Sequence, residues 1–356
     1  MSSRRSTGLD TLRGVALLVV IAGHSLLAVF GGGDWLRLLD PVYGVSLFFA
    51  ISGALVAPSI RSAYLAASLG GYLVQRGARL LLPHAFAIGV YAIPLIVAIR
   101  PDDYPASVLR SPGELLASLS LLFAIIPHGG AEPVNIGVPG NWSISTEWLA
   151  ALVLLPLFVR IANSERRSFY LFLALSLVGG VLSSLLVAES GSAGPLFWAP
   201  LHAGAFAGGW WAALRAEREE ALPLRRRLAV YFVLLPLVSA MVIWPSTSPA
   251  LAGVIGSLLV YRALRQRTTG GGGRLVAALS WIGSRSYGGY LAHFIGYLLA
   301  IEIGQSVGLT AWPLAAVTFV GGCIAAFAAA EPFARLVERP AIKLGKSVAS
   351  RLGPRS

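Results

Sequence analysis

Runs of about 20 apolar residues recur along this whole chain of 356 residues and strongly limit what it can fold into. A helix of about 20 residues spans ~30 Å, which matches the hydrocarbon core of a bilayer. Inside that core the backbone must satisfy its own hydrogen bonds, so each crossing segment is a helix or part of a closed barrel. The runs are continuous, whereas barrel strands alternate polar and apolar residues. The sequence therefore predicts an all-α, polytopic bundle of transmembrane helices in a lipid bilayer.

The composition agrees with this class, because 56% of the residues are hydrophobic and only 12% are charged. The net charge of +12 would suggest nucleic-acid binding in a soluble protein. Here the basic residues lie in short segments between the apolar runs, so we expect no nucleic-acid partner. The single cysteine, Cys323, excludes an intrachain disulfide and a cysteine cluster for a metal.

The apolar runs predict about ten crossings. These cover residues 10–30, 42–59, 80–99, 142–160, 168–188, 196–214, 228–244, 249–264, 279–301 and 311–334. Most of the 28 basic residues fall at the two ends of the chain and in every second connecting segment, which predicts that both termini are cytoplasmic. Leu115–Pro127 is too short to cross and is expected to be interfacial or re-entrant. We expect residues 1–340 to form the membrane domain and 341–356 a basic cytoplasmic tail.

Ionisable residues inside the runs are costly to insert and are therefore functional candidates. Arg13 and His24 are eleven residues apart in the first run, which places them on one helix face, ~16 Å apart along the axis. Glu147 lies one and a half turns into the fourth span, and we expect it at the same outer depth as His24. Histidine suits proton transfer near neutral pH. The alternatives are an interface anchor for Arg13, a histidine bonded between helices for His24 and a structural carboxylate for Glu147.

Arg76 and Arg79 are three residues apart and share a helix face at the predicted cytoplasmic entrance of the third span. Two guanidinium groups on one face suit the phosphates of a donor molecule, which guanidinium binds in a bidentate manner. The alternative is the ordinary excess of basic residues on the cytoplasmic side. These arginines are thus expected at the opposite end of the membrane from the two outer candidates above.

Three further polar residues are candidates for supporting roles: Ser52 in the second span, and Tyr290 and His293 in the ninth. For Ser52 the alternative is close helix packing, which small residues permit. Arg335 and Glu338 are three apart and are expected to form a local ion pair. The histidines lack carboxylate or histidine neighbours at helical ligand spacing, so we expect no metal site.

Six motifs occur in a fixed order along the chain. They are LDTLRGVALLVVIAGH (Leu9–His24), GVSLFFAISG (Gly44–Gly53), QRGARLLLP (Gln75–Pro83), NWSISTEW (Asn141–Trp148), SYGGYLAH (Ser286–His293) and VERP (Val337–Pro340). Through these motifs the chain resembles, over essentially its whole length, the bacterial integral-membrane acyltransferases known as acyltransferase family three. Many members of that family are polysaccharide O-acetyltransferases.

The resemblance implies a location in the bacterial cytoplasmic membrane and a cytoplasmic acyl donor, usually acyl-CoA, used as a co-substrate with no bound cofactor. It also implies an acceptor hydroxyl at the outer face, usually on a carbohydrate or glycoside. It implies that His24 and Arg13 are the essential residues of the first helix, and that Arg76 and Arg79 form the family's paired-arginine motif. Some relatives carry an appended SGNH-type hydrolase domain. We expect none here, so that any such partner would be separate.

We therefore expect His24 to be the general base on the acceptor hydroxyl, oriented by Glu147, with Arg13 on the donor path or at the acyl carbonyl. The main alternative is a transporter or flippase for a glycan or lipid-linked intermediate, which inverted repeats would favour and which the sequence does not show. A non-catalytic scaffold would have no need of buried charges. The acceptor, the acyl chain and the oligomeric state stay open.

Overall fold

The computed structural model describes residues 7–31, 40–65, 68–91, 112–125, 138, 140–190, 198–217, 248–265 and 273–352. These residues are helical almost throughout and include no strand, which confirms the predicted all-α class. They fall into two compact units. Unit 1 comprises Met1–Pro58, Leu157–Gly191 and Pro200–Ser286, and unit 2 comprises Ser59–Pro156, Ser192–Ala199 and Tyr287–Ser356.

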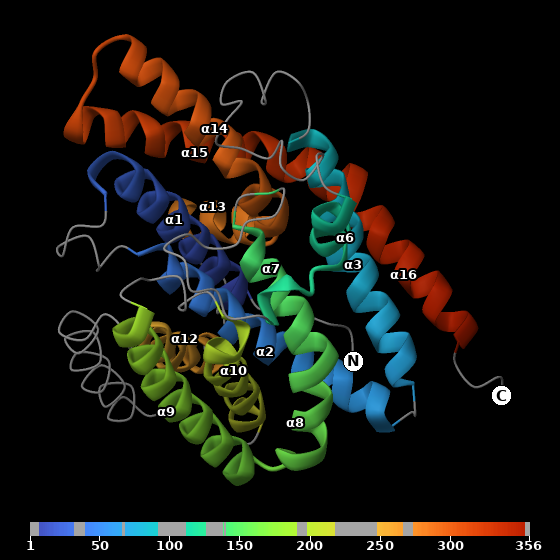
Figure 1. The fold of residues 1–356 in the computed structure, drawn as a ribbon. Helices are drawn as coiled ribbons and strands as arrows, with labels where there is room; N and C mark the ends of the chain where they lie inside the picture. The colour runs from blue at the N-terminus through green and yellow to red at the C-terminus, as the bar shows by residue number, and fades with distance from the viewer. Residues whose placement is uncertain are drawn as a thin grey trace. The chain divides into compact units, whose positions relative to one another are not determined.

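Unit 1 is built around helix α10 (Ala203–Ala216), which packs against both α9 and α12 (Figure 1). Trp210 of α10 is fully buried, and its indole nitrogen donates to the Ala162 carbonyl at 3.0 Å. A second contact in this unit joins α1 to α13. The remaining helices of unit 1 are α1 (Thr7–Phe30), α2 (Pro41–Leu65, its end in unit 2), α8 (Leu155–Ile161), α9 (Glu165–Ser190), α12 (Ser248–Arg265) and α13 (Arg274–Gly283), with a 3-10 turn, η5 (Ala199–His202).

Two long helical segments each contain a π-helical turn, and both turns lie in unit 2. The first runs from α7 (Asn141–Leu149) through the π turn η3 (Ala150–Leu154) into α8. The second runs from α15 (Ala311–Phe333) through the π turn η7 (Ala334–Glu338) into α16 (Arg339–Leu352). The other helices of unit 2 are α3 (Leu69–Tyr91), α6 (Pro112–Ser120), the 3-10 turn η2 (Phe123–Ile125) and α14 (Ser286–Ser306).

Five helical segments of the described chain are long and apolar enough to cross a membrane: Thr7–Phe30, Pro41–Leu65, Asn141–Ile161, Glu165–Glu189 and Ala311–Arg351. Helices occupy most of the described residues in the other predicted spans, but a turn at residues 284–285 divides the span 279–301 into α13 and α14. Residues 228–244 lie outside the described part. The third predicted span begins at Leu69 instead of residue 80, and α14 begins only at Ser286. The count of ten crossings and the cytoplasmic location of both termini stay predictions.

The C-terminal segment expected as a basic tail is helical as far as Leu352 and packs along α3. Ala341, Gly345 and Ala349 recur every four residues and face α3, and a Cβ added at Gly345 would lie 2.7 Å from the Ala78 Cβ. Small residues at this spacing let two helix backbones approach closely. Residues 339–352 therefore belong to unit 2, and the division into a membrane domain of residues 1–340 and a basic cytoplasmic tail stays a prediction.

Within its described residues, 115–125, the segment Leu115–Pro127 forms no spanning helix, as expected. Its helix α6 has nine residues, which is about 13 Å of length. The turn that follows is tied to α7 by Ser145, whose hydroxyl donates to the Leu121 carbonyl at 2.8 Å and accepts from the Ala124 N–H at 3.1 Å. One serine thus satisfies two backbone groups of a buried turn.

Candidate functional site

Arg76 of α3 and Glu147 of α7 form an ion pair within unit 2. The Arg76 side chain is only 10% exposed and that of Glu147 is 25% exposed, so the pair is largely removed from solvent. A mostly buried guanidinium needs such a partner, because a charge taken out of water without one is expensive. The contact makes Arg76 and Glu147 the charged centre of the candidate site in unit 2.

This contact corrects one expectation. Arg76 and Glu147 were predicted at opposite ends of the membrane, whereas two side chains in direct contact share one depth. The reason for the error is the start of the third helix, which begins at Leu69 and places Arg76 about two turns inside it. The expected role of Glu147 in orienting His24 stays a prediction, because His24 belongs to unit 1.

Two tyrosines lie near the ion pair. Tyr72 precedes Arg76 by one helical turn, is 8% exposed and interacts electrostatically with both Arg76 and Glu147. Its buried hydroxyl makes no hydrogen bond within the described residues. Tyr287 of α14 donates to the Leu80 carbonyl at 2.9 Å and interacts electrostatically with Arg76, Arg79 and Glu147. The paired arginines are thus brought together with Glu147 and two phenol groups.

A second polar cluster of unit 2 joins α14 to the start of α7. The Tyr290 and Ser143 hydroxyls are 2.9 Å apart, and the Gly140 carbonyl lies 3.1 Å from the first and 2.9 Å from the second. One hydroxyl can therefore donate to the other while the second donates to the carbonyl. His293 is fully buried, and its Nδ1 lies 2.5 Å from the Tyr290 carbonyl. Because a carbonyl only accepts, Nδ1 carries a proton and donates to it. The two supporting candidates of the ninth span therefore do meet, and their supporting role in catalysis stays a prediction.

In unit 1, helix α1 is continuous from Thr7 to Phe30, so the helical spacing that places Arg13 and His24 on one face holds. Arg13 lies 3.6 Å from the Asp10 carboxylate, three residues earlier, and both side chains are mostly buried. His24 is half-buried near the other end of α1. The first helix thus carries a buried cation at one end and an imidazole three turns away.

Ser52 is buried in α2 beside a tight helix contact. A Cβ added at the next residue, Gly53, would clash with the Phe206 carbonyl oxygen of α10. Phe206 also stacks on Phe49, with ring centroids 4.8 Å apart. This region of the GVSLFFAISG motif is therefore accounted for by packing, and the supporting role of Ser52 stays a prediction.

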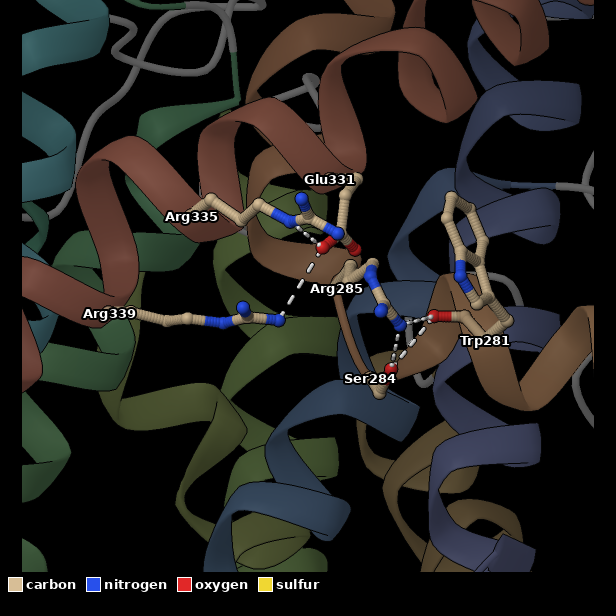
Figure 2. A network of polar contacts seen from close by, with 6 residues as sticks. All are labelled: Trp281, Ser284, Arg285, Glu331, Arg335 and Arg339. Carbon is tan, nitrogen blue, oxygen red and sulfur yellow. Dashed lines mark hydrogen bonds and ion pairs between the residues drawn. The ribbon is translucent and has the colours of Figure 1, made fainter.

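The ion pair expected between Arg335 and Glu338 does not form. Arg335 pairs with Glu331 instead, and Nη2 of Arg339 lies 3.6 Å from the same carboxylate (Figure 2). Glu338 accepts the Gly288 backbone N–H at 3.1 Å. Gly288 is in the first turn of α14, where N–H groups have no partner within the helix and the helix dipole favours an anion. Glu338 therefore caps α14.

Figure 2 also draws a separate network at the C-terminal end of α13, in unit 1. The Arg285 guanidinium lies over the Trp281 ring, 4.6 Å from its centroid. It donates to the Trp281 carbonyl at 3.1 Å and to the Ser284 hydroxyl at 2.8 Å. An arginine at a helix C-terminus satisfies carbonyls that have no partner within the helix, so Arg285 is accounted for as a cap.

The sequence reasoning missed Tyr72, Tyr287, Ser143 and Ser145 as individual site residues. The last three lie within the NWSISTEW and SYGGYLAH motifs, so the motifs themselves were a usable signal. Tyr72 lies in no motif that was singled out. Within the described residues no three His, Cys, Asp or Glu side chains lie together as metal ligands would.

Comparison with known proteins identifies the family. A family model described as an acyltransferase domain matches residues 6–331, which is nearly the whole chain. Neither the curated proteins nor the solved structures gave a match.

Proposed function

Since this chain belongs to the membrane acyltransferase family that the acyltransferase-domain model describes, we propose that it transfers an acyl group from cytoplasmic acyl-CoA to a hydroxyl at the outer face. The acyl group is acetyl in this proposal, and the acceptor is a carbohydrate or glycoside. The proposed location is the bacterial cytoplasmic membrane. Transport of a glycan is not favoured, because the family match is to an acyltransferase.

The observation that carries the proposal is the buried Arg76 guanidinium with its partner Glu147. A guanidinium has five N–H donors in a planar fork that matches the oxygens of a phosphate. Arg79 lies one turn further along α3 and acts on the same tyrosine, Tyr287. Two guanidinium groups at one place suit the phosphates of acyl-CoA. The contact with Arg76 supports a positioning role for Glu147 in donor binding.

In the proposed reaction the His24 imidazole accepts the proton of the acceptor hydroxyl as its oxygen attacks the thioester carbonyl carbon. The C–S bond then breaks, the acyl C–O bond is complete, and CoA leaves as the thiol after taking the proton from His24. Arg13 lines the donor path or stabilises the carbonyl oxygen as negative charge develops on it. Every atom and proton is accounted for without a further co-reactant.

The test is a transfer assay in vesicles, with labelled acetyl-CoA on one side and a panel of glycan and glycoside acceptors on the other. Removing a general base is expected to slow transfer by about 100-fold or more, so His24→Ala should be nearly inactive. The matched control is Ser25→Ala, because the Ser25 hydroxyl bonds only the Ile21 carbonyl of its own helix among the contacts described. Full activity of a correctly inserted His24→Ala protein would refute the proposed base.

A further inference from the structure

An apolar groove of about 230 Å³ lies within unit 2, where α3, α14 and the junction of α15 with η7 meet. Its walls include Phe86, Leu291, Ala329 and Phe333. The one side-chain hydroxyl in the lining, that of Tyr91, already donates to the Leu291 carbonyl at 2.7 Å. A sugar or nucleotide would find almost no hydrogen-bond partner here, whereas a hydrocarbon chain needs none.

The groove opens at the surface of unit 2. Leu336 lines it and is 76% exposed, and Phe86 lines it and is 50% exposed. In a chain with helices that can span a membrane, such apolar surface faces lipid and not water. The groove is therefore accessible to a lipid chain from the bilayer.

A basic face adjoins the groove on the same helical segment. Arg335 and Arg339 are 66% and 56% exposed, and they flank the groove residues Leu336 and Val337 in sequence. Figure 2 shows both guanidinium groups directed toward Glu331. Glu331 contacts the Nε of Arg335 and one terminal nitrogen of Arg339, which leaves further donors on both groups for an anion.

The charge around this face is positive on balance. Lys343 and Lys346 are exposed on the following turns of α16. The other nearby carboxylate, Glu338, is turned toward the Gly288 N–H at 3.1 Å. Clusters of basic residues directly after a membrane helix bind anionic phospholipid headgroups.

We propose that the groove and the Arg335–Arg339 face together form one binding site for an anionic phospholipid. One acyl chain of the lipid occupies the groove, and its phosphate is bound by the two guanidinium groups. This site is separate in its chemistry from the acyl transfer proposed above and does not depend on it. The lipid would hold α3, α14 and α15 together at the groove.

The experiment measures lipid retention by the full chain, purified in detergent, by native mass spectrometry. Phosphatidylglycerol and phosphatidylcholine with the same chains are compared, because they differ in headgroup charge. The intact protein should retain phosphatidylglycerol preferentially. The double variant Arg335→Ala/Arg339→Ala should bind it about tenfold or more weakly, since each basic residue near an anionic lipid contributes to affinity.

The groove is tested separately by Ala329→Trp, which places a large side chain in the lining. Its control is Ala328→Trp at the neighbouring exposed position, and the charge control is Arg166→Ala/Arg167→Ala at two exposed positions of α9 in unit 1. Both controls should retain phosphatidylglycerol. Equal retention of the two lipids, unchanged retention by Ala329→Trp, or equally strong binding of inorganic phosphate alone would each overturn the proposal. The exposed arginine variants give a result even if Ala329→Trp fails to fold.

Discussion

The Arg76 guanidinium and the Glu147 carboxylate, which are 71 residues apart in the chain, form an ion pair between α3 and α7. Both side chains are largely buried, so each charge depends on the other for compensation. The pair fixes α7 against the middle of α3 and sets the depth at which the proposed donor site lies.

Exchanging the two charges separates the structural role of this pair from its proposed role in binding. Arg76→Ala alone should lower the free energy of unfolding by about 3 kcal/mol, because it leaves the Glu147 carboxylate without its partner. The double variant Arg76→Glu/Glu147→Arg should recover much of that stability, measured by thermal unfolding in detergent. It should not recover acyl transfer, because the guanidinium is displaced from α3. Full transfer activity in the exchanged protein would exclude Arg76 from donor binding.

The two roles considered for Glu147 make different kinetic predictions for Glu147→Gln. If Glu147 positions Arg76, the variant should raise the KM for acyl-CoA about tenfold and leave the pH profile of kcat unchanged. If Glu147 orients His24, kcat should fall and its pH profile should shift, because the imidazole loses a charged neighbour. We expect the first result from the contact with Arg76. Steady-state kinetics over a range of pH distinguishes the two.

The cap that Glu338 provides to α14 should be worth more than the exposed ion pair one turn away. Glu338→Ala is expected to cost about 1–2 kcal/mol, because the Gly288 N–H loses its acceptor. Arg335→Ala, which breaks the exposed pair with Glu331, should cost less than about 1 kcal/mol. Chemical denaturation in detergent compares the two directly. Equal losses in the two variants would contradict the capping role.

Gly53 should tolerate no side chain, because the Phe206 carbonyl of α10 occupies the place of a Cβ. Gly53→Ala is expected to destabilise unit 1 by about 1–3 kcal/mol through overpacking. The control is Gly89→Ala in α3, where nothing lies within 4 Å of an added Cβ. That control should be neutral or slightly stabilising, because alanine favours a helix by about 1 kcal/mol over glycine. Melting temperatures of the two variants provide the comparison.

Ser145 should control the order of the turn that follows α6. In Ser145→Ala the Leu121 carbonyl loses its donor and the Ala124 N–H loses its acceptor, and both groups are buried. The free energy of unfolding should fall by about 1–3 kcal/mol. Hydrogen exchange should therefore quicken at the Ala124 amide. In Ser120→Ala, whose hydroxyl bonds only the Ala117 carbonyl of its own helix among the contacts described, that amide should exchange at the normal rate.

The helical class was predictable from the sequence because a run of apolar residues carries that information locally. The start of α3 was not predictable in this way. The apolar run begins only at residue 80, so it does not include the more polar first half of α3, which packs on α16. That half is stabilised by a helix more than 260 residues later in the chain, a contact that no local pattern records.

The site was predictable only in part for a similar reason. Motifs identified Arg76, Glu147, Tyr290 and His293 as candidates, and the structure describes all four within unit 2. The contact that Glu338 makes was not predictable in this way. Glu338 was assigned to Arg335 because the two are three residues apart, whereas the Gly288 N–H at the start of α14 donates to it. A spacing rule considers neighbours on one helix only, so it cannot predict a contact with an unsatisfied N–H group of another helix.

The π turn η7 has a consequence for insertions and deletions near the C-terminus. A π turn accommodates one residue more than an α-helical turn, so the faces of α15 and α16 are offset by that residue. Deleting any one residue from 334–338 would restore α-helical winding there and leave everything after it on nearly the same face, because the π turn absorbs its extra residue within about one turn. Ala341, Gly345 and Ala349 would then still face α3. The π turn is thus the place in this long helical segment where a single-codon deletion should do the least damage to the packing of α16 on α3.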